Sequence, residues 1–158
     1  MRNAVAIVFA SLVFASSLHA AVDDQKAVVD VLREYHAAFS AGEPKKVVTL
    51  LGPSFFIAGE RSDGRSERMA AHLFHTGEKL QAWPGNYLDQ AGPHVNEFET
   101  VSVSIRLDSA VVLTRDTGSN RFRSWKDEEV AWFLGRAGGE WRIVGMIIRD
   151  IQLPAETR

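Results

Sequence analysis

The clearest pattern along the chain is a run of apolar residues spaced three and four apart near the N-terminus, which predicts an amphipathic helix. Its apolar positions are Val28, Val31, Leu32, Tyr35, Ala38 and Phe39. Asp23 and Asp24 precede the run at positions suited to an N-cap, and Gly42 follows where helices commonly end. The pattern therefore indicates a helix whose apolar face meets a core.

Three further elements are predicted between residues 44 and 93. Pro44 suits the first turn of a short helix that runs to Leu51. Residues 55–58 are apolar throughout, which is typical of a strand covered on both faces. A third helix is expected over residues 65–82, ended by Pro84-Gly85 and followed by a loop. Its apolar stripe consists of Met69, Leu73, Thr76, Leu80 and Trp83.

The last third of the chain is strand-like. Apolar and polar residues alternate over 101–107, and shorter apolar runs follow at 110–115, 129–135 and 141–151. Helices first and strands afterwards predict an α+β fold, with the N-terminal helices packed on a strongly bent antiparallel sheet. The last two runs carry large apolar residues on both faces, so a second copy of the chain is expected to cover the outer one.

Residues 1–20 have the organisation of a signal peptide. Arg2 precedes an apolar run over 4–15, and residues 17–20 resemble the small-residue cleavage site that would place the cut before Ala21. The run is short for a membrane span, although a retained anchor helix is the alternative. We therefore expect a periplasmic or secreted protein, with one domain over residues 21–158 and no membrane association after cleavage. The chain has no cysteine, so disulfides and thiol chemistry are excluded.

Charge argues against a nucleic-acid partner. Without Arg2, the chain has 17 basic and 20 acidic residues, and no basic block exceeds two or three residues. Binding to a phosphate backbone requires a basic stripe or patch, which this sequence lacks. Hydrophobic residues make up 46% of the chain of 158, enough for one domain with a core of its own.

Three motifs resemble the nuclear transport factor 2-like superfamily, which includes ketosteroid isomerases, polyketide cyclases and scytalone dehydratases. They are the helix end Tyr35 to Glu43, the run Val47 to Leu51, and the closing Gly138 to Val144. The resemblance covers nearly the whole mature chain. It implies a conical pocket between the helices and a concave sheet in a cystatin-like α+β roll, and a homodimer formed through the sheet.

The resemblance to ketosteroid isomerase also implies candidate catalytic residues. The family's oxyanion donor is a tyrosine eight residues before the acidic residue of the helix end, which here is Tyr35. The family's base falls sixteen residues after that acidic residue, on Gly59, and Glu60 is its neighbour. A bulge near Gly59 would return Glu60 to the pocket. The family's second aspartate has no counterpart over 111–115; Asp116 comes at the strand end.

Each candidate also has a structural interpretation. Tyr35 is either a core tyrosine with a hydrogen-bond partner or a donor into the pocket. Glu60 is either a solvated carboxylate at the rim or a general base. His72 and His75 are three apart on the expected third helix; His72 borders its apolar face and is an alternative base, and with no third ligand we expect no metal.

The pocket wall is expected to be formed by six residues, and no cofactor is expected. They are Phe39, Phe56, Met69, Leu73, Trp132 and Arg149. Trp132 is otherwise a core or interface residue, and Arg149 otherwise part of a surface pair with Asp150. An arginine in the cavity would favour an anionic ligand.

Three functions follow as hypotheses. The first is a domain that binds a small, largely apolar ligand. The second is an isomerase, dehydratase or cyclase acting on a carbonyl compound, with Tyr35 as donor and Glu60 or His72 as base. The third is a protein-interaction module that uses the sheet face. Fold alone does not decide among them.

Overall fold

The computed structural model describes the backbone of residues 23–62 and 67–149, and the side chains of residues 23–59 and 75–149. The N-terminal helix covers residues 23–40 and ends as predicted at Gly42, whose φ is +68°. Helix α2 (Pro44–Leu50) begins at the proline, and helix α3 spans Gly77–Ala91. The signal-peptide prediction for residues 1–20 lies outside the described residues.

The six strands of the described ranges form one mixed sheet in the order β2-β1-β6-β5-β4-β3. They are β1 (Leu51–Ser62), β2 (Glu67–Thr76), β3 (Val95–Arg106), β4 (Ser109–Ser119), β5 (Ser124–Ala137) and β6 (Glu140–Ile148). Four strand pairings are antiparallel, as expected. The fifth, between β1 and β6, is parallel; in the sequence these two strands are separated by β2, α3 and strands β3 to β5.

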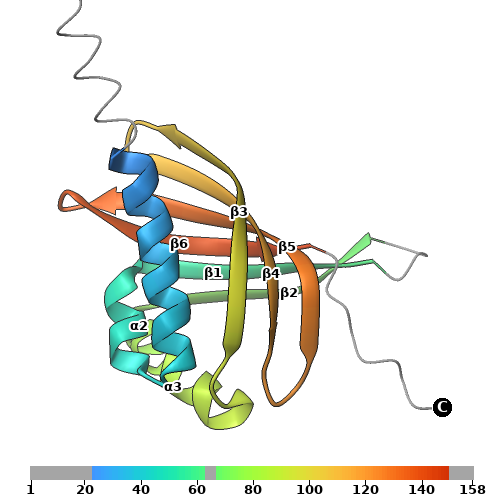
Figure 1. Cartoon of the computed structure of the whole chain (residues 1–158). Coiled ribbons are helices and arrows are strands. Elements are labelled where there is room, and N and C mark those ends of the chain that lie inside the picture. Colours follow the sequence, from blue (N-terminus) through green and yellow to red (C-terminus); the bar gives the residue numbers. More distant parts are fainter. Residues whose placement is uncertain (1–22, 63–66, 150–158) are drawn as a thin grey trace, which may run out of the picture.

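The predicted α+β class is confirmed. The sheet curves around the N-terminal helix, while α2 and α3 lie at one end of the concave side (Figure 1). Among the described strands, β2 and β3 are the sheet edges and do not pair with each other, so the sheet stays open. The concave face and the helices therefore enclose a space on one side of the sheet only.

The predicted third helix over 65–82 is wrong. Residues 67–76 form β2, which pairs with β1 as a hairpin, and the helix begins only at Gly77. This segment is rich in alanine, leucine and methionine, which favour helices in isolation, so pairing with β1 overrides local propensity. Pro84 also fails to end the helix: it lies inside α3, which continues to Gly92.

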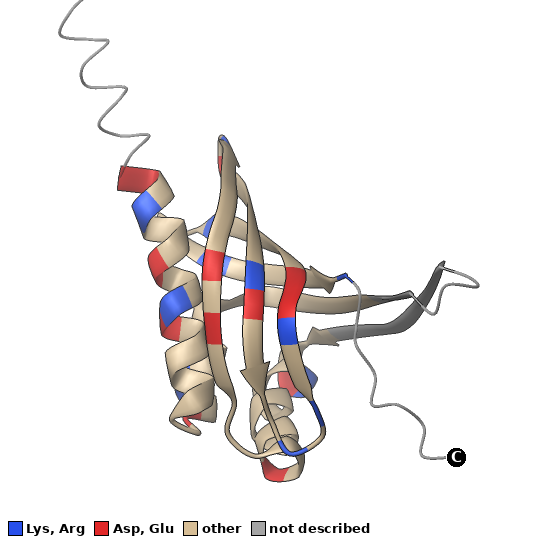
Figure 2. Cartoon of the chain, turned by 45° about the vertical axis from the view of Figure 1, so that its right-hand side comes forward, with Lys and Arg blue, Asp and Glu red and all other residues tan. Residues whose placement is uncertain are grey.

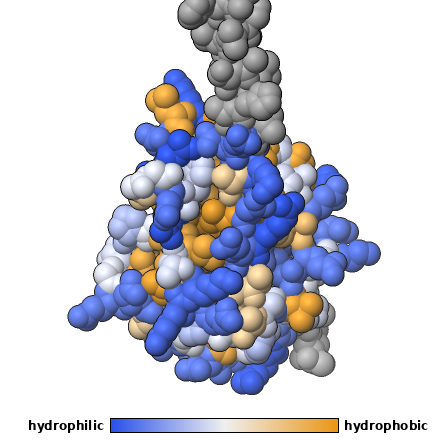
Figure 3. Space-filling model, turned by 60° about the vertical axis from the view of Figure 1, so that its left-hand side comes forward, coloured by the Kyte–Doolittle hydropathy of each residue, from blue (hydrophilic) through white to orange (hydrophobic). Residues whose placement is uncertain are grey.

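The core lies between the N-terminal helix and the sheet. Its largest fully buried side chains include Trp132, Phe39, Phe55 and Leu32. The face shown in Figure 3 is mostly hydrophilic, with hydrophobic residues visible near its centre. Burial of these aromatic and aliphatic side chains is the main stabilising contribution in a chain without disulfides.

The outer side of β3, β4 and β5 carries charges of both signs (Figure 2). Glu99, Arg115 and Glu129 lie opposite one another on the three strands. Such mixed charges on exposed strand positions are ordinary for a solvated surface. No helix in the described ranges combines the length and the apolar character needed to cross a bilayer.

Candidate functional site

A cavity of about 210 Å³ lies between the N-terminal helix, α3 and the concave face of the sheet. Six aromatic residues line it: Tyr35, Phe39, Trp83, Tyr87, Trp125 and Trp132. Aliphatic residues of β1, β5 and β6 complete the apolar wall, while polar side chains gather on the N-terminal helix and at the ends of β3, β4 and β5. The cavity is thus largely apolar with one concentrated set of polar groups, the usual composition of a small-molecule site.

Three of the residues predicted from sequence lie in this wall. Tyr35 and Phe39 come from the N-terminal helix, and Trp132 comes from β5. Tyr35 contacts both of the others edge-on, at ring-centroid distances of 4.9 Å to Phe39 and 5.3 Å to Trp132. No side-chain hydrogen bond between described residues involves its hydroxyl.

Two predicted wall residues lie elsewhere. Phe55 and Ile57 point to the helix side of β1, so alternation places Phe56 on the outer face, 5.5 Å from the ring of Phe133. Arg149 lies in a separate small depression of the outer face, next to Glu129. Arg149 therefore does not face the cavity and cannot attract an anionic ligand into it.

The remaining predicted residues belong to the β1–β2 hairpin, and their side chains lie outside the described residues. In the backbone register, Glu60 is opposite Met69, Ala58 opposite His72 and Ile57 opposite Leu73. The expected irregularity after Gly59 is present, although the extra residue is Ala70, on β2. Gly59 shares the face of Ile57, a cavity residue, so the family's base position offers no side chain here.

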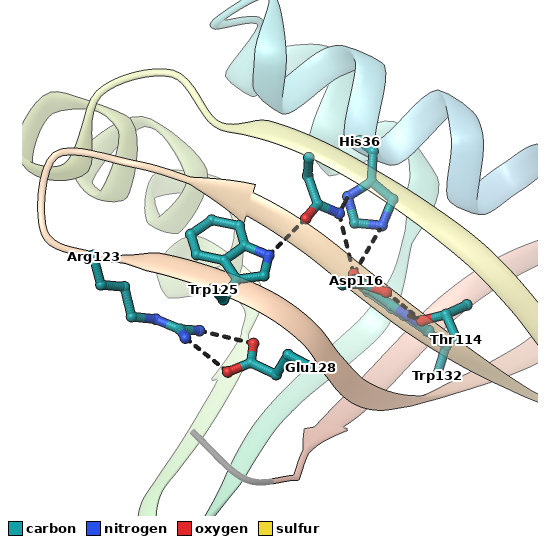
Figure 4. Close-up of polar contacts among 8 residues, drawn as sticks. His36, Thr114, Asp116, Arg123, Trp125, Glu128 and Trp132 are labelled. Atoms are coloured by element: carbon teal, nitrogen blue, oxygen red, sulfur yellow. Dashed lines mark hydrogen bonds and ion pairs between the residues drawn. The ribbon is translucent and has the colours of Figure 1, made fainter. Parts of the chain in front are cut away.

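A chain of hydrogen bonds converges on Asp116, at the far end of β4 (Figure 4). The Trp125 indole donates to Oδ1 of Asn96 at 2.8 Å, which identifies the other atom of that amide as its nitrogen. The amide nitrogen then donates to Oδ2 of Asp116 at 3.1 Å. From the other side, Trp132 donates to Oγ1 of Thr114 at 3.0 Å, and Thr114 donates to Oδ1 of Asp116 at 2.5 Å. Both carboxylate oxygens therefore act as acceptors.

The same network determines the tautomer of His36. Its Nδ1 lies 3.0 Å from the amide nitrogen of Asn96 and so accepts a hydrogen bond from it. In the neutral ring the proton is then on Nε2, a buried atom without a hydrogen-bond partner in the described part of the chain. Burial lowers the pKa of His36 to about 3, and His94 adds to this. The ring is neutral at physiological pH.

Asp116 and Tyr35 have pKa values shifted in the same direction. Burial raises the pKa of Asp116 to about 6, although hydrogen bonds from Thr114 and Asn96 act the other way. Burial also raises the pKa of Tyr35 strongly, with smaller contributions from Tyr87 and Asp116. At neutral pH, Tyr35 is thus a neutral hydroxyl and Asp116 is mainly ionised.

A second set of hydrogen-bonded side chains, Asn120, Tyr87 and His94, lies in another part of the cavity wall. Asn120 donates to the hydroxyl of Tyr87 at 3.0 Å, and that hydroxyl lies 2.9 Å from Nε2 of His94. Tyr87 accordingly donates to His94, which leaves the histidine proton on Nδ1. Burial lowers the pKa of His94 to about 4, so this ring is also neutral.

Arg123 and Glu128 form the third polar element. The guanidinium contacts both carboxylate oxygens, at 2.7 and 3.0 Å, and lies 4.8 Å from the ring centre of Trp125. Glu128 is almost completely buried, so this two-point pairing compensates its charge. Figure 4 shows the pair beside the chain that ends at Asp116.

Sequence reasoning missed most of this polar cluster, although strand alternation contained the signal. Ala110, Val112, Thr114 and Asp116 share one face of β4, so the buried face extends to the carboxylate. Gly118 lies within β4, two residues after Asp116. A Cβ there would meet Asn96 and Trp125 at 2.8 Å, so the glycine allows those two side chains to join.

Comparison with known proteins identifies the fold. No protein-family model matches the chain, and no curated protein matches it. Solved structures do match. A "Putative Scytalone Dehydratase" from Novosphingobium aromaticivorans has a TM-score of 0.62 at 10% identity, over 87% of this chain and 95% of that one. A cystatin-like domain of unknown function from Nostoc punctiforme has a TM-score of 0.61 at 15% identity, over 85% and 80%.

A further match is an NTF-2-like protein of unknown function from Shewanella oneidensis, with a TM-score of 0.58 at 14% identity, over 80% of this chain and 99% of that one. The chain has the nuclear transport factor 2-like fold. At these identities the likeness concerns the fold alone, and proteins of the nuclear transport factor 2-like fold differ in function. No cluster of three or more potential metal-binding side chains occurs in the described ranges.

Proposed function

We propose that this domain binds a small, largely apolar molecule in the cavity beside Tyr35. The observation that carries the proposal is the cavity itself: about 210 Å³ stays open among large aromatic side chains that could have filled it. Protein interiors are normally close-packed, so an unfilled space with buried polar groups at its edge is typical of a binding site. The neighbouring folds support a ligand-binding or enzyme-like domain in general terms.

Native mass spectrometry of the purified protein is the direct test, because it detects a retained molecule. Replacing Ile57, a cavity residue on β1, by tryptophan should fill the space and abolish binding. Lys45→Trp is the control, because Lys45 is exposed on α2 and does not line the cavity. The proposal fails if neither a retained mass nor saturable binding of any small apolar probe is found, or if Ile57→Trp leaves binding intact.

A second candidate function is proton-transfer catalysis on a carbonyl compound. The observation in its favour is that Tyr35 and Asp116 line one cavity, a neutral donor with a carboxylate whose pKa of about 6 suits a general base. Glu60 and His72, the bases expected from sequence, remain proposals. The check is exchange of α-hydrogens of a small cyclic ketone in D₂O, followed by NMR. If wild-type protein exchanges these hydrogens no faster than Asp116→Asn does, this candidate function is excluded.

We also propose an exported homodimer in which a second copy covers the outer face of the sheet. Leu113 and Val101 are 43% and 49% exposed and line the same small depression of the outer face, where a second copy could cover both. Light scattering should give twice the chain mass, and Leu113→Asp should give a monomer. A wild-type monomer leaves the interaction-module alternative, in which the face binds another protein.

Export predicts a mature N-terminus at Ala21 in periplasmic or secreted material.

A further inference from the structure

The wall of the cavity is an arc of rings that begins and ends at the same carboxylate. Successive ring centroids are 4.9–6.0 Å apart along the series Trp132, Tyr35, Phe39, Tyr87, His94 and Trp125. The indoles at the two ends donate toward Asp116, one through Thr114 and the other through Asn96. Asp116 therefore occupies the gap between the two ends of an otherwise aromatic enclosure.

The charges around this enclosure do not balance. Among the described lining residues, Arg123, Glu128 and Asp116 carry the formal charges, and Arg123 is engaged with Glu128 at two points. The hydrogen-bond partners of Asp116 are neutral, and the nearby His36 is neutral because burial lowers its pKa to about 3. Counted over the side chains that the structure describes, one negative charge therefore has no compensating cation in this largely apolar site. Burial of an uncompensated carboxylate is costly, so a complementary ligand would be favoured.

The protein already places a cation against one of these rings. The guanidinium of Arg123 lies over Trp125 at 4.8 Å from the ring centre, within the range of a cation–π interaction. Electron-rich faces of tryptophan and tyrosine attract cations, and several such faces around one space are the usual way in which proteins recognise substituted ammonium groups. The rings and the charge of Asp116 favour the same kind of ligand.

We infer that the ligand of this cavity is an organic cation, a protonated or quaternary amine with an apolar body, and that Asp116 is its counter-ion. The inference rests on the proposed binding function and deepens it by naming the ligand class. An anionic ligand would meet the charge of Asp116 at close range, and a neutral one would leave that charge uncompensated. The apolar body would lie among the aromatic side chains, with its nitrogen toward the polar end.

Three probes of similar size separate these cases: benzylamine, benzyl alcohol and benzoate, which differ in charge and share one ring. Titration of the purified wild-type protein at about pH 7.5 should show benzylamine binding at least about tenfold tighter than benzyl alcohol, with benzoate the weakest. Asp116→Asn should abolish the preference, so that benzylamine binds no tighter than benzyl alcohol to the variant. Glu129→Gln, which removes an exposed charge on the outer face of β5, is the control and should change neither.

The wild-type protein supplies a second readout that does not depend on any variant folding. The groups that face Asp116 are Tyr35, His36 and Glu128, besides the neutral Asn96 and Thr114, and only Asp116 has a pKa between 5 and 7 among those with a resolved shift. Benzylamine should therefore bind about tenfold more weakly at pH 5 than at pH 7, because Asp116 protonates with a pKa of about 6. Benzyl alcohol should show no such loss.

The outcomes distinguish this inference from the function on which it rests. Tighter binding of benzyl alcohol or benzoate, or a neutral or anionic molecule retained in native mass spectrometry, overturns the organic-cation inference and leaves the binding function intact. If none of the three probes binds and no molecule is retained, the proposed function fails and the inference fails with it. A benzylamine preference that survives Asp116→Asn and does not vary with pH removes Asp116 from the role of counter-ion.

Discussion

The Nε2 atom of His36 lies 3.8 Å from Oδ2 of Asp116, beyond hydrogen-bond distance, although both side chains are almost fully buried. The amide of Asn96 contacts both groups, because it donates to Nδ1 of His36 and to Oδ2 of Asp116. That arrangement makes Nδ1 an acceptor and leaves the proton on Nε2. The structure therefore combines a neutral imidazole with a carboxylate that is ionised at neutral pH.

The two histidines of the cavity wall should have opposite tautomers. We expect ¹⁵N NMR to find the proton of His36 on Nε2 and that of His94 on Nδ1, because Asn96 donates to the first ring and Tyr87 to the second. His75, which stacks on Trp83 outside these networks, is the internal comparison. Imidazolium shifts for His36 near pH 6 would contradict the assignment and would make the His36–Asp116 pair an ion pair.

His36 should also make the protein less stable in acid. Its pKa is about 3 in the folded chain and about 6.5 when unfolded, so the unfolded state binds the proton first. Stability from this group is then complete above pH 6.5 and is lost as the pH falls, by about 1.4 kcal/mol per unit. Asp116 acts oppositely, because its folded pKa of about 6 is raised and protonation below it favours the folded state.

The measurement is urea unfolding at several pH values for wild type and His36→Gln. The difference between their free energies of unfolding should change by about 1.4 kcal/mol per unit between pH 5.5 and 4, since the variant lacks one titrating group. Using a difference cancels the contributions of surface carboxylates that do not interact with His36. Parallel pH profiles would show that His36 titrates alike in the folded and unfolded chains.

Two tyrosines offer a matched test of which hydroxyl faces a ligand. Tyr87 hydrogen-bonds to Asn120 and His94, so Tyr87→Phe should lower the free energy of unfolding by about 1 kcal/mol or more. No hydrogen bond between described residues involves the hydroxyl of Tyr35, which lines the cavity, so Tyr35→Phe should change the free energy of unfolding by less than about 0.5 kcal/mol. Denaturant unfolding of both variants decides the comparison. A larger loss for Tyr35→Phe would assign that hydroxyl to a structural hydrogen bond.

Much of the fold could be predicted from local patterns, because they are repeated over whole elements. The N-terminal helix has six apolar positions on one stripe and a glycine with positive φ at its end. The hairpin between β5 and β6 follows from Gly138-Gly139, whose φ values are +61° and +87°. The apolar stripe through Met69, Leu73 and Thr76 predicts a helix over residues 65–82, whereas pairing with β1 makes residues 67–76 a strand.

The candidate site was harder to predict because its parts come from four elements. Tyr35 could be singled out on its own helix, but Asn96 and Asp116 meet only through the register of β3 and β4, where Phe98 is opposite Asp116. On β5, Trp125 precedes Asp127 and Glu128 follows it. The φ of +53° at Asp127 interrupts the alternation of buried and exposed residues, so both Trp125 and Glu128 are buried. A pattern read along one strand does not reveal such a convergence.

The outer position of Phe56 leads to a last prediction, at Gly145 on β6. A Cβ at Gly145 would lie 2.1 Å from the Phe56 ring, so Gly145→Ala should lower the free energy of unfolding by about 1–3 kcal/mol. Gly85→Ala is the control, because its nearest neighbour would be 3.9 Å away and alanine favours a helix. Adding Phe56→Leu should restore at least about half of the lost stability, since the smaller side chain removes the contact.

Because Phe56 lies outside the cavity, Phe56→Leu alone should leave probe binding unchanged. If Phe56→Leu weakens binding instead, the ring contributes to the site and its assignment to the outer face is wrong.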